Sequence, residues 1–216
     1  GGGMRDSFGA GIWDYCLDNG IVFDFAVGVS AGSGTLANFV AGQRGRTMNY
    51  YLDYAFRKEY MSMKNLLMKK NFVDLDYAYG TLSNSDGEDP LDYEAFVASP
   101  TDYRVVATEA ETGHPHIFTK ADMKRDNYAP IKASSCVPVI NQAYPVDGRR
   151  YYDGGLSNPI PLDFAFDQGC DKIVLILTRP RDYNRSAKDD ERSVRIIKRK
   201  FPETAATLAA RADTYN

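Results

Sequence analysis

The sequence has little cysteine, little histidine and no long apolar run. Its three cysteines, Cys16, Cys136 and Cys170, are widely spaced, odd in number and without a metal-ligand pattern. This usage argues against a disulfide framework and favours a reducing compartment. No apolar run approaches the roughly 20 residues that a membrane-spanning helix needs. We therefore predict a cytoplasmic protein, with peripheral membrane contact left open as an alternative.

Strong charge of one sign is also absent. The net charge of -3 gives no broad attraction to nucleic acid, so we expect no nucleic-acid partner. Acidic residues and histidines show no spacing typical of a calcium or zinc loop. We therefore expect no metal and no cofactor, and activity that survives chelation.

What is present is enough apolar sequence for a core. The chain has 216 residues, of which 44% are hydrophobic, and we predict a single domain over residues 1–216. Gly1, Gly2 and Gly3 resemble the turn after a strand, and the first residue is not Met. We therefore expect a strand before Gly1, and a signal peptide stays open. The sequence stops at Asn216 just after a helical pattern, so a further C-terminal segment stays open as well.

Helical and strand patterns alternate along the chain. The expected helices are Gly9–Asn19, Ser33–Ala41 and Asn158–Gln168. The expected strands are Phe23–Val29, Tyr103–Ala110, His114–Thr119 and Lys172–Thr178, of which the second and third form a hairpin. This alternation predicts an α/β fold with a mostly parallel central sheet.

The stretch AVGVSAGSGT places Ser30 between Gly28 and Gly32, after an apolar run and before a helical pattern. A strand, the pattern G-x-S-x-G and a helix are typical of a nucleophile elbow, in which the turn exposes the serine oxygen above the sheet. A helix cap or a tight turn explains the same residues about equally well. A phosphate-binding P-loop fits less well, because no lysine precedes the Ser or Thr.

A nucleophilic serine needs a base, and the histidines supply one poorly. His114 and His116 both lie at the start of the second hairpin strand, where surface or strand histidines are the favoured interpretation. An α/β-hydrolase esterase using either histidine stays open. A carboxylate alternative is Asp153, which precedes Gly154 and Gly155, although Asp-Gly-Gly alone more often marks a turn.

Three motifs in order resemble those of the patatin-like phospholipases. They are GGGMRD (1–6), GVSAGS (28–33) and DGG (153–155), and the flanking stretches YRVVATEAETG, ASSCVP and SNPIPLDFAFDQGCDKIVLIL are also similar to the family. The resemblance runs from Gly1 to about Thr178. It implies a three-layer α/β/α fold and hydrolysis of phospholipid or lysophospholipid esters by a Ser-Asp dyad without histidine.

The resemblance also assigns roles to residues. Ser30 is implied as the nucleophile and Asp153 as the base. The implied oxyanion hole comprises Gly1, Gly2, Gly3, Met4 and Arg5, with the amides of residues 2–4 facing the oxyanion and Arg5 near the mouth. Asp6 departs from the pattern, because the family has glycine there, and this raises the question of whether the backbone at Asp6 is left-handed.

A second class of function stays open, because a catalytically weak lipid-binding or regulatory protein could keep the same fold. The segment from Tyr50 to Phe72 interleaves aromatic residues and methionines with lysines, which is compatible with a lipid-facing lid. An ordinary amphipathic helix pair is the favoured interpretation of that segment.

Overall fold

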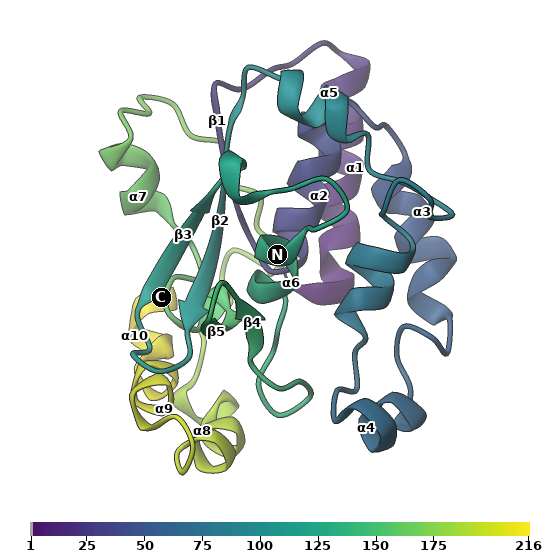
Figure 1. Ribbon diagram of the computed structural model, residues 1–216. Helices are drawn as coiled ribbons and strands as arrows, with labels where there is room; N and C mark the ends of the chain where they lie inside the picture. Colours follow the sequence, from purple (N-terminus) through teal and green to yellow (C-terminus); the bar gives the residue numbers. More distant parts are fainter. Residues whose placement is uncertain (1) are drawn as a thin grey trace.

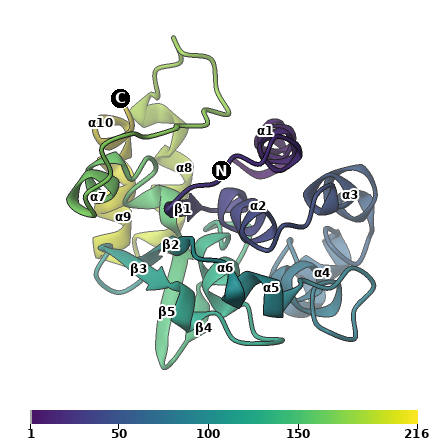
Figure 2. The same ribbon diagram turned by 90° about the horizontal axis from the view of Figure 1, so that it is seen from above.

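The computed structural model describes residues 2–216 and has helices on both sides of a sheet (Figures 1 and 2). The helices are α1 (Ser7–Asp18), α2 (Ala31–Val40), α3 (Arg46–Leu52), α4 (Met63–Lys69), α5 (Tyr93–Ala98), α6 (Ala129–Ser134), α7 (Leu162–Asp167), α8 (Glu191–Ile197), α9 (Pro202–Ala209) and α10 (Arg211–Tyr215). The strands are β1 (Phe25–Val29), β2 (Asp102–Glu109), β3 (Pro115–Thr119), β4 (Tyr144–Val146) and β5 (Arg149–Asp153). Short helical turns include η1 (Gly3–Asp6), η2 (Tyr54–Phe56) and η5 (Gly154–Leu156).

The layers follow the predicted α/β class. Figure 2 shows the sheet between α1 and α2 on one side and α7 and α9 on the other. The expected first helix, first strand and second helix correspond to α1, β1 and α2, and the expected hairpin corresponds to β2 and β3. These predictions are confirmed.

Strand β2 organises the sheet, because three strands pair with it. Strand β1 pairs with its residues 102–106 in parallel, and β5 pairs with residues 107–109 in antiparallel fashion. Strand β3 pairs antiparallel with residues 104–108, overlapping both registers, so it occupies the opposite edge of β2. The carboxyl ends of β1 and β5 therefore meet on one edge of β2, beside Val106 and Ala107.

Fewer strand pairs of the sheet are parallel than the sequence predicts. Among the strand pairs of residues 2–216, β1–β2 is parallel, and β2–β3, β2–β5 and β4–β5 are antiparallel. The expected strand at Lys172–Thr178 is not formed, and Val174 and Leu175 in it are 60% and 44% exposed. Strand propensity alone does not pair a segment: β1 ends the described sheet with one unpaired edge, and residues 172–178 form no ladder with it.

The helix expected at Asn158–Gln168 begins later than predicted, at Leu162. Pro159 and Pro161 account for the delay, because a residue that precedes proline is disfavoured in the helical region. The segment before α7 therefore stays irregular, and Pro159, Ile160 and Pro161 line the large cavity described below.

Two apolar clusters hold the layers together. The first packs α2 and α6 on β2 and includes Phe39, Tyr103, Val105 and Ile131. The second joins β5 to the C-terminal helices through Tyr152, Leu156, Phe201, Ala205 and Leu208. The second cluster matters for the site, because it docks α8 and α9 beside the end of β5, and α10 contacts α9.

Candidate active site

Ser30 occupies a strained turn between β1 and α2. Its backbone has φ 57° and ψ -136°, a conformation that is uncommon for a residue with a side chain. The turn is tight: a Cβ added at Gly28 would lie 2.5 Å from the Cα of Ser33. These features match the predicted elbow, and strain of this kind persists where the surroundings enforce it.

A second serine holds this turn in place. The backbone N–H of Ser30 donates to Ser134 Oγ at 2.8 Å, and that hydroxyl donates to the carbonyl of Val106 at 2.6 Å. Ser134 ends α6 and is completely buried. It thus links the elbow to β2. The sequence reveals only that Ser134 lies in the stretch ASSCVP, with nothing to indicate this role.

Asp153 reaches Ser30 because of the strand register. It is the last residue of β5 and pairs with Ala107, one position beyond the Val29–Val106 pair of β1. Its N–H donates to the carbonyl of Cys136 at 2.8 Å, and its own carbonyl accepts from Thr108 Oγ1 at 2.8 Å. The backbone that carries the carboxylate is therefore fixed on both sides.

Glycine at position 154 is required by the same junction. A Cβ added there would lie 2.1 Å from the carbonyl oxygen of Val106, closer than any real contact. The chain can therefore turn beneath β2 only where residue 154 has no side chain. Gly155 follows with its N–H donating to Asp153 Oδ1 at 2.8 Å.

The Asp153 side chain is 5% exposed, and this burial raises its pKa above the ordinary value for aspartate. A hydrogen bond from the Ser30 side chain, the Gly155 amide and the nearby positive charge of Arg211 oppose the shift. The carboxylate is thus a stronger base than an exposed aspartate, and the hydroxyl that it faces belongs to Ser30.

The glycine-rich loop borders the cavity that Ser30 and Asp153 also line. Gly2, Gly3 and Arg5 line one cavity together with Ser30 and Asp153, whereas the side chain of Met4 is 44% exposed and lies outside this lining. Gly1 lies outside the described residues. Part of the predicted oxyanion loop therefore borders the same cavity as the serine.

The backbone at Asp6 explains why an aspartate is accommodated where the family has glycine. Its backbone is right-handed, with φ -70° and ψ -5°, so no glycine is needed there. Its buried carboxylate accepts a hydrogen bond from Thr35 Oγ1 and a longer one, 3.5 Å, from the Tyr51 hydroxyl. Asp6 therefore ties the loop to α2 and α3.

The cavity has a volume of about 580 Å³. Its lining includes apolar residues of β1 and of the segment 172–178. It also includes Arg185, Arg211 and Tyr215 from the C-terminal segment. Such a mixture of apolar walls and a few polar groups is typical of small-molecule sites.

The two histidines are elsewhere. His116 pairs with the opposite edge of β2 and stacks on Phe118 and Tyr151, with ring centroids 4.5 and 5.2 Å apart. His114 is exposed, and neither histidine lines the cavity. Burial lowers the pKa of His116, in keeping with a strand side chain packed on aromatic rings.

Two features are missing from the described residues 2–216. Within this range, no three His, Cys, Asp or Glu side chains gather so as to hold a metal ion. No helix in the same range combines the length and apolar character needed to cross a bilayer.

Comparison with known proteins places these features in a family. The family model described as "Patatin-like phospholipase" matches residues 1–166. A curated relative described as "Uncharacterized protein YjjU", from Escherichia coli (strain K12), is 28% identical over 185 residues, which cover 83% of this chain and 50% of the relative. The chain spans about half the length of that relative. Since the family model covers most of the chain, the protein belongs to the patatin-like phospholipases, a family of lipid acyl hydrolases.

Proposed function

We propose that the protein hydrolyses carboxylic esters of phospholipids or lysophospholipids, with Ser30 as nucleophile and Asp153 as general base. The observation that carries this proposal is that the Ser30 side chain, held at a strained turn, lies close enough to the buried Asp153 carboxylate to lower its pKa. Nucleophile and base in contact, with the base fixed by further groups, form the usual arrangement of covalent catalysis by serine.

The proposed chemistry has two halves. In the first, Ser30 Oγ attacks the ester carbonyl carbon as its proton passes to Asp153. The developing oxyanion is stabilised by amides of the Gly2–Gly3 loop and by the N-terminus of α2. Collapse of this intermediate breaks the ester bond, and the leaving alcohol takes the proton from Asp153. In the second half, water attacks the acyl-serine, Asp153 accepts its proton, and the fatty acid leaves as Ser30 is reprotonated.

Burial of Asp153 supports the role of base. An ordinary aspartate, with a pKa near 4, accepts a proton poorly. Because burial raises the pKa of Asp153, proton transfer from Ser30 is less uphill than it would be to an exposed carboxylate. The positions of His114 and His116 outside the cavity argue against a histidine base.

The test is hydrolysis by the full chain of a panel containing phospholipids, lysophospholipids, triacylglycerols and short acyl esters, with Ser30→Ala as the blank. We expect turnover of the phosphate-bearing lipids that falls to background in Ser30→Ala and persists in His114→Ala and His116→Ala. Equal turnover in Ser30→Ala, loss of turnover in a folded histidine variant, or binding of lipid without turnover would each contradict the proposal.

We further propose that α4 contacts the membrane surface that holds the substrate. Met63, Leu67 and Met68, which we name the α4 surface, are 61%, 78% and 76% exposed. Exposed lysines, Lys64 and Lys70, lie beside them. Exposed apolar side chains among lysines favour an anionic bilayer surface.

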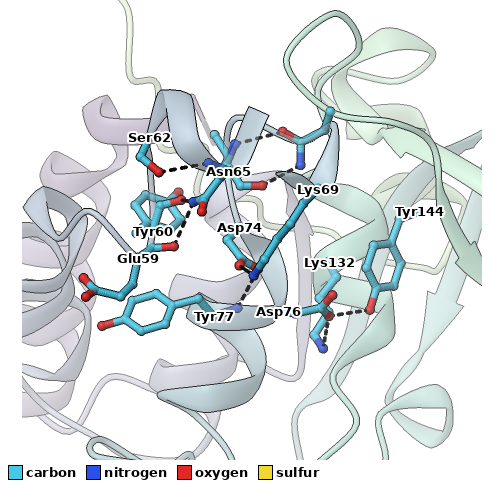
Figure 3. Close-up of polar contacts among 12 residues, drawn as sticks. Glu59, Tyr60, Ser62, Asn65, Lys69, Asp74, Asp76, Tyr77, Lys132 and Tyr144 are labelled. Atoms are coloured by element: carbon cyan, nitrogen blue, oxygen red, sulfur yellow. Dashed lines mark hydrogen bonds and ion pairs between the residues drawn. The ribbon is translucent and has the colours of Figure 1, made fainter. Parts of the chain in front are cut away.

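The opposite side of α4 is held by polar contacts, which Figure 3 shows. Ser62 Oγ accepts from the Asn65 N–H at 3.1 Å, Asn65 Nδ2 donates to the Glu59 carbonyl at 2.9 Å, and Lys69 pairs with Asp74. The helix is thus oriented by its polar side, so the apolar residues do not face the core.

The α4 surface lies toward the reactive end of the fold. Figure 1 shows α4 at the lower end, to which the arrow of β2 points. The loop beside it is half-exposed and apolar: Val139 and Ile140 are each 37% exposed, and the Ile140 carbonyl accepts from the Phe72 N–H at 2.7 Å. Val137, in the same loop, lines the cavity. The loop 137–140 therefore contacts the segment after α4 at Phe72 and contributes Val137 to the cavity.

Vesicle sedimentation tests this contact. We expect the full chain to bind vesicles of phosphatidylcholine with phosphatidylglycerol, and Leu67→Glu to weaken binding about tenfold or more, because a charge replaces buried apolar area at the interface. Val97→Glu is the matched control, since Val97 is 49% exposed on α5, at the other end of the molecule (Figure 1). Equal binding by Leu67→Glu and wild type would overturn the membrane contact.

A further inference from the structure

The C-terminal segment brings a pair of arginines to the cavity. Arg185 and Arg211 both line it, and both are largely buried, with side chains 14% and 20% exposed. They lie beyond residue 166, where the family match ends. The cluster of Tyr152, Leu156, Phe201, Ala205 and Leu208 fixes this segment against β5.

Arg185 and Arg211 share one carboxylate, that of Asp190, which is already paired with Arg185. Arg185 donates two hydrogen bonds to Asp190, from Nε to Oδ2 at 2.9 Å and from Nη2 to Oδ1 at 2.7 Å. Arg211 Nη1 lies 3.5 Å from the same Oδ1, which is long for a charged hydrogen bond. Arg211 Nε is buried and has no hydrogen-bond partner. A buried guanidinium with an unpaired donor and one long ion pair would be stabilised by another anion.

Arg211 points to the reacting end of the cavity. A Cβ added at Gly155 would lie 3.2 Å from Arg211 Nη2 and 3.0 Å from Asp153 Oδ1, so guanidinium and carboxylate flank the same point. The positive charge also acts on Asp153, whose pKa it lowers against the effect of burial. Burial of Arg211 and the nearby positive charge of Arg185 together lower the pKa of Arg211.

We infer that Arg211, supported by Arg185, forms a subsite for the phosphate group of the ester substrate. This inference rests on the proposed hydrolysis at Ser30 and specifies its substrate as a phosphate-bearing acyl ester. A phosphate there offers pairs of oxygens that the planar guanidinium can bind through two parallel hydrogen bonds. The phosphate also adds negative charge, because the single carboxylate of Asp190 does not neutralise both arginines. Tyr183 and Tyr215, which line the same region, give the subsite aromatic walls.

Binding without turnover is the first test. In the Ser30→Ala background, calorimetry with inorganic phosphate and with glycerol 1-phosphate reports the subsite alone. We expect saturable binding of glycerol phosphate that weakens at least tenfold in Ser30→Ala/Arg211→Gln and is unchanged in Ser30→Ala/Arg181→Gln. Arg181 is the control because it is an exposed arginine of the same segment outside the cavity lining. Absence of saturable binding, or equal binding by the Arg211→Gln variant, would overturn the subsite.

Kinetics separate binding of phosphate from an effect on Asp153. The substrates are a monoacylglycerol phosphate and the monoacylglycerol with the same acyl chain, both below their aggregation limits. We expect Arg211→Gln to lower kcat/KM at least tenfold for the phosphate-bearing ester and less than threefold for the neutral one. An equal loss on both esters, with an altered pH profile, would make Arg211 a positioning residue for Asp153 and overturn the inference. If wild type cleaves neither ester while Ser30→Ala still binds glycerol phosphate, the proposed hydrolysis fails and the phosphate site stands.

Discussion

Two apolar runs border the cavity, and only one of them is a strand. Phe25–Val29 forms β1, pairs with β2 and buries Ala26 and Val29 to 7% and 8% exposure. Lys172–Thr178 is richer in β-branched and aliphatic residues, yet it forms no strand, and Val174 is 60% exposed. The difference is the neighbouring edge: β2 supplies hydrogen-bond partners to the first run, and no described strand supplies them to the second.

The same contrast separates the reacting groups from their surroundings. Ser30 and Asp153 follow or end paired strands, and the backbone around them is fixed by Ser134, Thr108 and Cys136. The side of the cavity formed by residues 172–178 has no comparable ladder. We therefore expect substitutions on the paired side to have large effects and those on the unpaired side to have small ones.

The largest effect is expected for Asp153→Asn. Asparagine cannot accept the proton of Ser30, so kcat for a cleavable ester should fall by about 10³ or more. Val174→Ser, on the unpaired side, should leave kcat within about threefold, because the side chain is mostly in water. Steady-state kinetics on folded variants measure both. Comparable losses in the two variants would break the distinction between the two sides.

The paired sheet and the unpaired run 172–178 should also differ in how much their side chains contribute to the free energy of unfolding. Val105→Ala removes buried methyl groups in the middle of β2 and should lower the free energy of unfolding by about 2 kcal/mol. Val174→Ala should change it by less than about 0.5 kcal/mol. Urea unfolding followed by circular dichroism gives both values. A large cost for Val174→Ala would show that residues 172–178 are paired in solution.

Much of this arrangement is visible in the sequence. The glycines around Ser30 and after Asp153 predict tight turns, and the structure has them at positions where a Cβ would collide with backbone atoms. The prediction at Lys172–Thr178 is wrong because strand formation depends on a partner edge, which local sequence does not encode. Ser134 and Arg211 could not be predicted, since each acts through contacts with residues far away in the chain.

Ser134→Ala tests how firmly the paired side holds Ser30. Removal of the hydroxyl leaves the Ser30 N–H and the Val106 carbonyl without their partner in a buried place. We expect kcat to fall about tenfold with little change in KM, because the elbow loses a support and the substrate loses no contact. Ser134→Thr keeps the hydroxyl and should restore part of the activity if its extra methyl group fits. A change in KM alone would argue that Ser134 acts on substrate binding instead.

The smallest expected effect is on stability, and it has the opposite sign to the effect on turnover. Burial raises the pKa of Asp153 in the folded protein, so its ionisation opposes folding. The cost is absent below the unfolded pKa, where the group is protonated in both states, and is complete above the folded pKa. Asp153→Asn should therefore stabilise the protein at pH 8 by about 1 kcal/mol, a rise in Tm of roughly 2 to 4 °C. The advantage should shrink as pH falls through the folded pKa of Asp153, whereas Asp163→Asn, at an exposed position on α7, should leave Tm nearly unchanged. Thermal unfolding of the three proteins between pH 5 and 8 measures this, and a lower Tm for Asp153→Asn at pH 8 would mean that the charge of Arg211 and the hydrogen bonds of the carboxylate outweigh its burial.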